Sequence, residues 1–169
     1  MPRIFWPILL ATLAAWLAMN LWSLPKIEEL AGGLRLLDMR FTGYSIEDVR
    51  GFLVEIGDEG AALYLGPQFW LDMIFPPLLG AVLFMIYRWL FPGLPGLIIG
   101  AVSLTYVATD FLENLAIAAL LRAGFAGVTP EMAATAHFWT TAKWSLAVVG
   151  LVFLVIGVGL RLRRRWTEG

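Results

Sequence analysis

Two carboxylates and an amide share one face of an otherwise apolar segment. The segment runs from Thr105 to Leu121 and carries Asp110, Glu113 and Asn114. Residues three and four positions apart lie on the same side of a helix, so these three side chains face one way. Ionisable groups inside a membrane-spanning helix are costly and usually point into the helix bundle. We therefore treat this face as a candidate functional site.

Further polar residues lie in two other apolar stretches. One stretch holds Asp72, and another holds in its first third His137, Thr140, Thr141 and Lys143. We predict an ion pair between Lys143 and either Glu113 or Asp110, with hydrogen bonds completed by Asn114 and the threonines. Acids outnumber the lysine and burial disfavours their ionisation, so we expect at least one acid to be protonated near neutral pH. An alternative is that the pair serves only to fix the register of the helices.

The residue types present exclude several other kinds of site. The chain has no cysteine, which excludes disulfides, thiol redox chemistry and thiolate metal sites. It has one histidine, and no E-x-x-H spacing occurs, so we expect no metal site. Neither a G-x-S-x-G elbow nor a glycine-rich phosphate loop is present. No cofactor is expected, and no pattern indicates a particular reaction.

Asp72 is followed by two prolines, Pro76 and Pro77. A proline has no amide hydrogen, so the carbonyl groups four residues earlier, those of Asp72 and Met73, lose their helical donors. Within a membrane such a carbonyl must find another partner. We expect the freed carbonyl of Asp72 to serve a ligand, a water molecule or a neighbouring helix.

The elements that carry these residues read as membrane spans. The chain is 60% apolar and 15% charged, whereas soluble domains are about 25% charged. Four apolar stretches are long enough to cross a hydrocarbon core of about 30 Å, namely residues 4–24, 67–90, 97–121 and 133–160. We predict an all-α integral membrane protein, a four-helix bundle forming one transmembrane domain over residues 1–169. The first span exceeds the apolar length of about 7–15 residues in a signal peptide, so we expect a retained anchor.

The polar segment of residues 26–60 predicts two short amphipathic helices. In the first, apolar residues at helical spacing run from Ile27 to Leu37, interrupted by Gly32 and Gly33. We expect both helices to lie on the membrane surface or to cover the outer end of the bundle.

The second of these helices has clear end signals. Ser45 and Asp48 form the S-x-x-D pattern that caps exposed amides at a helix start. The glycines and acids of residues 57–60 predict its end.

Basic residues predict the orientation of the chain in the membrane. Arg3 precedes the first span, Arg88 ends the second, and four arginines follow the fourth, at positions 161 and 163–165. Positive residues mark the cytoplasmic side, which predicts cytoplasmic termini in a bacterial inner membrane and an outward-facing segment at 26–60. All the polar candidates then fall in the outer half of the bilayer. Arginines beside a membrane helix set its orientation, so we expect no nucleic-acid partner.

The layout resembles that of EXPERA-type membrane proteins, the group of sterol isomerases and related lipid-binding receptors. The shared features are four helices, cytoplasmic termini, a long first outer loop and, from Asp72 to Pro77, an acid followed by prolines in the second helix. This resemblance is architectural and implies a lipid site.

Three functions fit these patterns. The first is binding of a lipid or small hydrophobic molecule in a pocket with a polar floor and with apolar walls from Trp70, Tyr106 and Trp144. The second is an accessory or assembly subunit whose outer helices dock a membrane protein partner. The third is a proton- or ion-coupled transporter acting as an oligomer, because four spans are few for one transporter.

Overall fold

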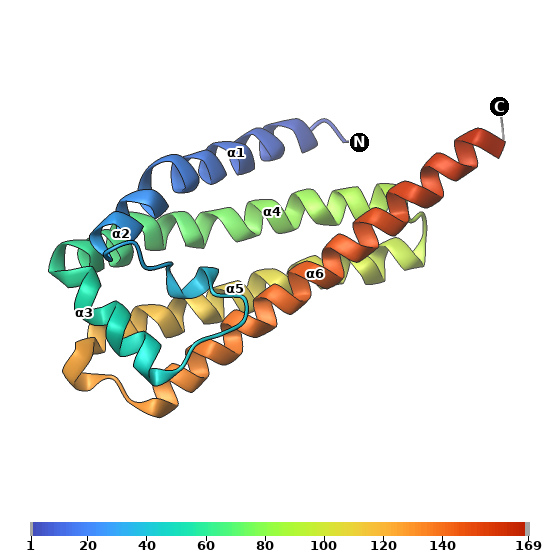
Figure 1. Cartoon of the computed structure of the whole chain (residues 1–169). Helices are drawn as coiled ribbons and strands as arrows, with labels where there is room; N and C mark the ends of the chain where they lie inside the picture. Colours follow the sequence, from blue (N-terminus) through green and yellow to red (C-terminus); the bar gives the residue numbers. More distant parts are fainter. Residues whose placement is uncertain (1, 168–169) are drawn as a thin grey trace.

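The chain folds into an up-and-down bundle of four long helical runs (Figure 1). The computed structural model describes residues 2–167, and no strand occurs in that part of the chain. The helices are α1 (Phe5–Ala18), α2 (Leu24–Leu30), α3 (Ile46–Leu63), α4 (Phe69–Leu90), α5 (Leu94–Gly127) and α6 (Pro130–Thr167). The runs Phe5–Leu30, Ile46–Leu90, Leu94–Gly127 and Pro130–Arg164 are each long and apolar enough to cross a membrane. This supports the prediction of an integral membrane protein.

The two ends of the bundle differ in their packing. The start of α1 and the end of α6 lie at one end, and α2 and α3 lie at the other (Figure 1). A tightly buried apolar core occurs at the second end, where Leu36, Phe52 and Leu120 are fully enclosed. Elsewhere large apolar side chains point outward from the helices, as Leu10 and Val155 do at 66% and 64% exposure. Such continuous apolar surface is typical of helices that face lipid.

The segment between α2 and α3, residues 31–45, crosses the bundle and is here called the strap. Helix α2 ends at Leu30 because Gly32 and Gly33 adopt φ of 64° and 84°, a left-handed conformation that favours glycine. The prediction of one helix continuing to Leu37 is therefore wrong. Leu37 is instead fully buried in a short 3₁₀ turn, Leu37–Met39.

Helix α3 begins where the sequence predicts. Ser45 Oγ accepts a hydrogen bond from the Asp48 amide at 3.1 Å, and Asp48 Oδ2 accepts one from the Ser45 amide at 2.8 Å. The predicted end at residues 57–60 is a break at Gly57, with φ 57°, after which helical structure resumes toward α4. How α2 and α3 lie relative to a membrane surface stays a prediction.

Two wider, π-helical turns interrupt the long helical runs. One, Met19–Ser23, joins α1 to α2, and the other, Tyr64–Gln68, joins α3 to α4. Each precedes or contains a proline, Pro25 or Pro67, which cannot donate its share of the helical hydrogen bonds. The two turns meet through a hydrogen bond from Ser23 Oγ to Gln68 Oε1 at 2.5 Å. They thereby tie the first helical run to the second.

A glycine on α6 allows close packing at the opposite end of the bundle. A Cβ at Gly157 would lie 2.7 Å from Phe91 Cε2 and 3.0 Å from Leu90 Cβ, whereas one at Gly159 would meet nothing within 4 Å. We predict that Gly157→Ala lowers the free energy of unfolding by about 1–3 kcal/mol through overpacking. Gly159→Ala should leave it unchanged or raise it by up to about 1 kcal/mol. Unfolding in mixed micelles measures both, and equal effects would contradict this packing.

Candidate functional site

A pocket of about 190 Å³ opens in the half of the bundle that the strap covers. We call it the polar pocket. Its polar lining residues are Asn20, Asp38, Asp72, Asp110 and Lys143, and its aromatic lining residues are Trp16, Phe75, Tyr106 and Trp144. Asp38, Asp72 and Asp110 are each only 6–7% exposed. The strap and the long helices thus bring acidic and aromatic side chains together in one place.

Lys143 forms an ion pair with Glu113, one of the two partners that the sequence predicts for it. Glu113 is fully buried and does not line the polar pocket, whereas Lys143 does. Removing one partner of such a pair leaves a buried charge uncompensated, which is strongly destabilising. The pair therefore joins α5 to α6. It also means that Glu113, outside the pocket lining, is the counter-ion of the one lysine that lines the pocket.

Asn114 satisfies the carbonyl group that Pro76 leaves without a helical donor. Its Nδ2 donates to the Asp72 carbonyl oxygen at 3.1 Å and to Asp110 Oδ1, also at 3.1 Å. Of the three partners expected for this carbonyl, the structure shows a neighbouring helix. The side-chain amide of Asn114 on α5 therefore replaces the missing helical donor in α4 and also holds Asp110.

The side chain of Asp72 is held from the other direction. Gln68 Nε2 donates to Asp72 Oδ2 at 2.7 Å, and Gln68 Oε1 accepts the hydrogen bond from Ser23. Both Ser23 and Gln68 are fully buried in the two π-helical turns. Hydrogen bonds from the neutral side chains of Ser23 and Gln68 thus connect the Met19–Ser23 turn to this carboxylate of α4.

Asp38 belongs to the site although sequence reasoning missed it. Tyr64 Oη donates to Asp38 Oδ1 at 2.7 Å, and Trp144 Nε1 donates to the Asp38 carbonyl oxygen at 2.9 Å. The sequence pattern places this segment with helices on the membrane surface or over the outer end of the bundle, where an acid needs no explanation. The available signal is that Asp38 lies between the apolar residues Leu37 and Met39.

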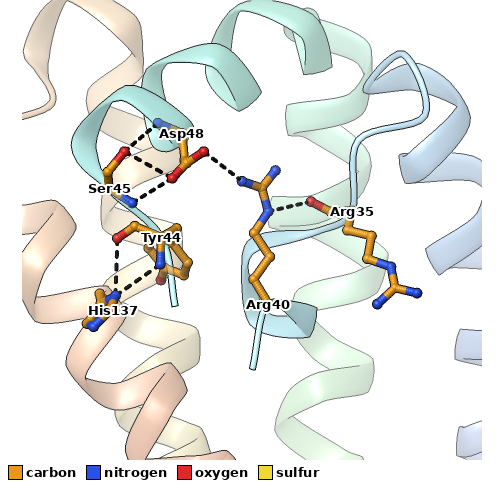
Figure 2. A network of polar contacts seen from close by, with 6 residues as sticks. All are labelled: Arg35, Arg40, Tyr44, Ser45, Asp48 and His137. Atoms are coloured by element: carbon orange, nitrogen blue, oxygen red, sulfur yellow. Dashed lines mark hydrogen bonds and ion pairs between the residues drawn. The ribbon is translucent and has the colours of Figure 1, made fainter. Parts of the chain in front are cut away.

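His137 lies outside the polar pocket and fastens the strap (Figure 2). Its Nδ1 accepts a hydrogen bond from the Tyr44 amide at 3.0 Å and lies 3.1 Å from the Tyr44 carbonyl oxygen. Gly43, with φ 83°, lies beneath the imidazole ring, and a Cβ there would overlap the ring. Close contact with the backbone explains the glycine at this position.

The threonines near His137 divide between two roles. Thr140 is fully buried, and its Oγ1 lies 3.2 Å from Tyr44 Oη. Burial raises the pKa of the Tyr44 hydroxyl above its ordinary value, so this contact is between neutral groups. Thr141 instead donates to the carbonyl oxygens of His137 and Phe138 in its own helix, each at 3.0 Å.

The strap is also fastened to α3 (Figure 2). Arg40 Nε donates to the Arg35 carbonyl oxygen at 3.1 Å, and Arg40 Nη1 lies 3.9 Å from Asp48 Oδ1. Contacts with both α3 and α6 therefore hold the segment that carries Asp38.

The structure thus separates the predicted site residues into groups. Asp72, Asp110 and Lys143 line the polar pocket, Glu113 and Asn114 support them from behind, His137 and Thr140 hold the strap, and Thr141 bonds to its own helix. Of the expected aromatic walls, Tyr106 and Trp144 line the pocket, while Trp70 is 65% exposed at the surface.

A second, apolar pocket of about 210 Å³ lies next to the polar one, between α4, α5 and α6. Its walls include Leu79, Leu83, Val102, Leu146 and Leu154. Tyr106 and Ala147 line both pockets. The site therefore has a polar end near the strap and an apolar end that extends toward the middle of the bundle.

Within residues 2–167 no group of three histidine, aspartate or glutamate side chains is placed to hold a metal ion. The carboxylates of the polar pocket instead offer hydrogen-bond acceptors and negative charge along its wall. No family model, curated protein or solved structure matches this chain. The function proposed next therefore rests on the geometry of the site.

A double-mutant cycle tests the link between Asn114 and Pro76. In Pro76→Ala the new amide hydrogen can donate to the Asp72 carbonyl within α4, so this carbonyl no longer needs Asn114. We predict that Asn114→Leu lowers the free energy of unfolding by about 1–3 kcal/mol in the native sequence and by about 1 kcal/mol less in the Pro76→Ala background. Unfolding in mixed micelles provides the measurement. The same cost in both backgrounds would contradict the proposed compensation.

Proposed function

We propose that the protein binds a lipid or another small hydrophobic molecule inside the membrane. The observation that carries this proposal is that a polar and an apolar pocket share Tyr106 and Ala147 in their walls. A ligand with one polar end and one apolar chain matches a site divided in this way. The polar end would lie beside the aspartates, and the chain would lie among the leucines of the apolar pocket.

The size of the site favours a slender ligand. The two pockets measure about 190 and 210 Å³, and each alone is smaller than the ~300–1,000 Å³ of common ligand sites. Only together do they reach the lower end of that range. A single-chain amphiphile suits this space better than a bulky one.

The arrangement of the acids supports binding over a role in helix register alone. The Glu113–Lys143 pair already joins α5 to α6. Asp38, Asp72 and Asp110 add the cost of burying acids without a second lysine to pair with them. Because these acids line a pocket, a bound ligand could use them as hydrogen-bond acceptors.

We also propose a bacterial inner membrane location with both termini in the cytoplasm and the polar pocket in the outer half. In support, Arg88 lies in the last turn of α4, and α4 ends at the end of the bundle where α1 begins and α6 ends (Figure 1). Arg161 Nη1 donates to the Trp89 carbonyl oxygen at 3.0 Å, and its guanidinium lies 3.7 Å from the centre of the Trp89 ring. Arginine with tryptophan is a common anchor at a membrane boundary.

Filling the junction of the pockets tests the binding function. We predict that Ala147→Phe removes hydrophobic molecules that co-purify with the native protein, as measured by native mass spectrometry. The control is Val149→Phe, which adds a ring at a position that is 42% exposed. Retention of the same ligand mass by the Ala147→Phe protein would contradict the proposal. A stoichiometric polypeptide in place of a small ligand would favour the accessory-subunit function.

Cysteine labelling tests the orientation. Because the chain has no native cysteine, only the introduced residue can react with the label. We introduce Glu59→Cys near the end of α3 and Trp166→Cys near the end of α6, both at exposed positions. A membrane-impermeant maleimide added to intact spheroplasts should label Glu59→Cys, and it should label Trp166→Cys only after lysis. The unmodified protein serves as the background control. The reverse pattern would overturn the orientation.

A further inference from the structure

Acidic side chains outnumber basic ones in the lining of the polar pocket. Asp38, Asp72 and Asp110 line it, and Lys143 is the one basic residue among its lining residues. The ammonium of Lys143 is already paired with Glu113, which lies behind the wall. The three aspartates therefore have no cationic side chain of their own in the pocket lining.

Each of these aspartates is oriented by a separate neutral donor. Tyr64 holds Asp38, Gln68 holds Asp72, and Asn114 holds Asp110, at 2.7, 2.7 and 3.1 Å. Holding acceptors in place with a second layer of hydrogen bonds is the usual construction of a preorganised binding site. Three carboxylates along the lining of one pocket are thus held in fixed positions.

Aromatic rings complete the lining. Trp16, Phe75, Tyr106 and Trp144 line the same pocket. Lys143 Nζ lies 5.8 Å from the centre of the Trp144 ring, within the distance at which a cation is attracted to an aromatic face. A pocket of carboxylates and aromatic rings is suited to an organic cation.

Other head groups fit the pocket less well. A carboxylate or phosphate would meet three acids, and the one basic side chain among the lining residues is already paired with Glu113. A hydroxyl would offer a single hydrogen to several acceptors. A divalent metal ion needs oxygen ligands converging at about 2.0–2.6 Å, and no such group of acids occurs between residues 2 and 167.

We infer that the ligand of this site carries an organic ammonium group on a single apolar chain. This inference rests on the proposed binding function and names its ligand class. The ammonium lies among the three aspartates near the strap, and the chain passes Tyr106 and Ala147 into the apolar pocket. A zwitterionic phospholipid is disfavoured because its phosphate would approach the same aspartates.

Chain-matched probes test the head group. Decylamine, decanol and decanoate share one chain length, and at pH 7 the amine is cationic because its ordinary pKa is near that of lysine, about 10.4. Binding to the purified full-length protein in nanodiscs is followed by tryptophan fluorescence, since Trp16 and Trp144 line the pocket. We expect decylamine to bind about tenfold or more tightly than either other probe.

Two variants locate the effect. Asp72→Asn and Asp110→Asn should each weaken decylamine about tenfold and leave decanol unchanged. Asp58→Asn removes an exposed acid from α3 and should change neither. A thermal melt shows whether each variant is folded, and if one is not, the comparison of the three probes on the native protein decides.

The outcomes separate this inference from the function on which it rests. If decanol or decanoate binds as tightly as decylamine, or if the co-purifying molecule is neutral or anionic, the ammonium assignment is wrong and hydrophobic binding stands. If no probe binds saturably and Ala147→Phe releases nothing, both are wrong. Recovery of an amine-bearing amphiphile from the native protein, a lipid or a free amine, supports both.

Discussion

A single lysine ammonium lies among four buried carboxylates, and the cost of burying these groups shapes the surrounding structure. Lys143 pairs with Glu113, and the remaining acids are Asp38, Asp72 and Asp110. Buried charge is tolerated only when it is paired or well supplied with hydrogen bonds. The neutral donors around these acids and the relay through both π-helical turns meet that requirement. The polar pocket exists because the supports stand behind the acids and leave their pocket side open.

Prolines create the backbone geometry on which these supports depend. Pro25 and Pro67 accompany the two π-helical turns, which bring Ser23 and Gln68 into contact. Pro76 frees the carbonyl of Asp72 for Asn114. At Asp72 the missing amide hydrogen is therefore offset by a polar side chain from another helix, as a membrane interior requires. Helix packing and the polar site are consequences of the same backbone feature.

The strap links the tightly packed end of the bundle to the pocket. Its apolar residues Leu36 and Leu37 enter the buried core, while Asp38, next in sequence, enters the polar pocket. His137 and Thr140 of α6 hold its far end through Tyr44. The strap therefore covers the polar pocket on one side. On the other side, the apolar pocket lies between α4, α5 and α6.

The sequence by itself determined the four long apolar helices, the start of α3 at Ser45 and the need for a partner at the Asp72 carbonyl. These features follow from hydropathy, helical periodicity and the missing amide of a proline, all of which act over a few residues. The tertiary structure decided that the strap leaves the helix, that Asp38 joins the site and that His137 does not. It also placed an apolar pocket beside the polar one, with Tyr106 and Ala147 in the walls of both. These outcomes depend on side-chain directions and on contacts between residues far apart in the chain, such as Asp38 with Trp144, which no local pattern encodes.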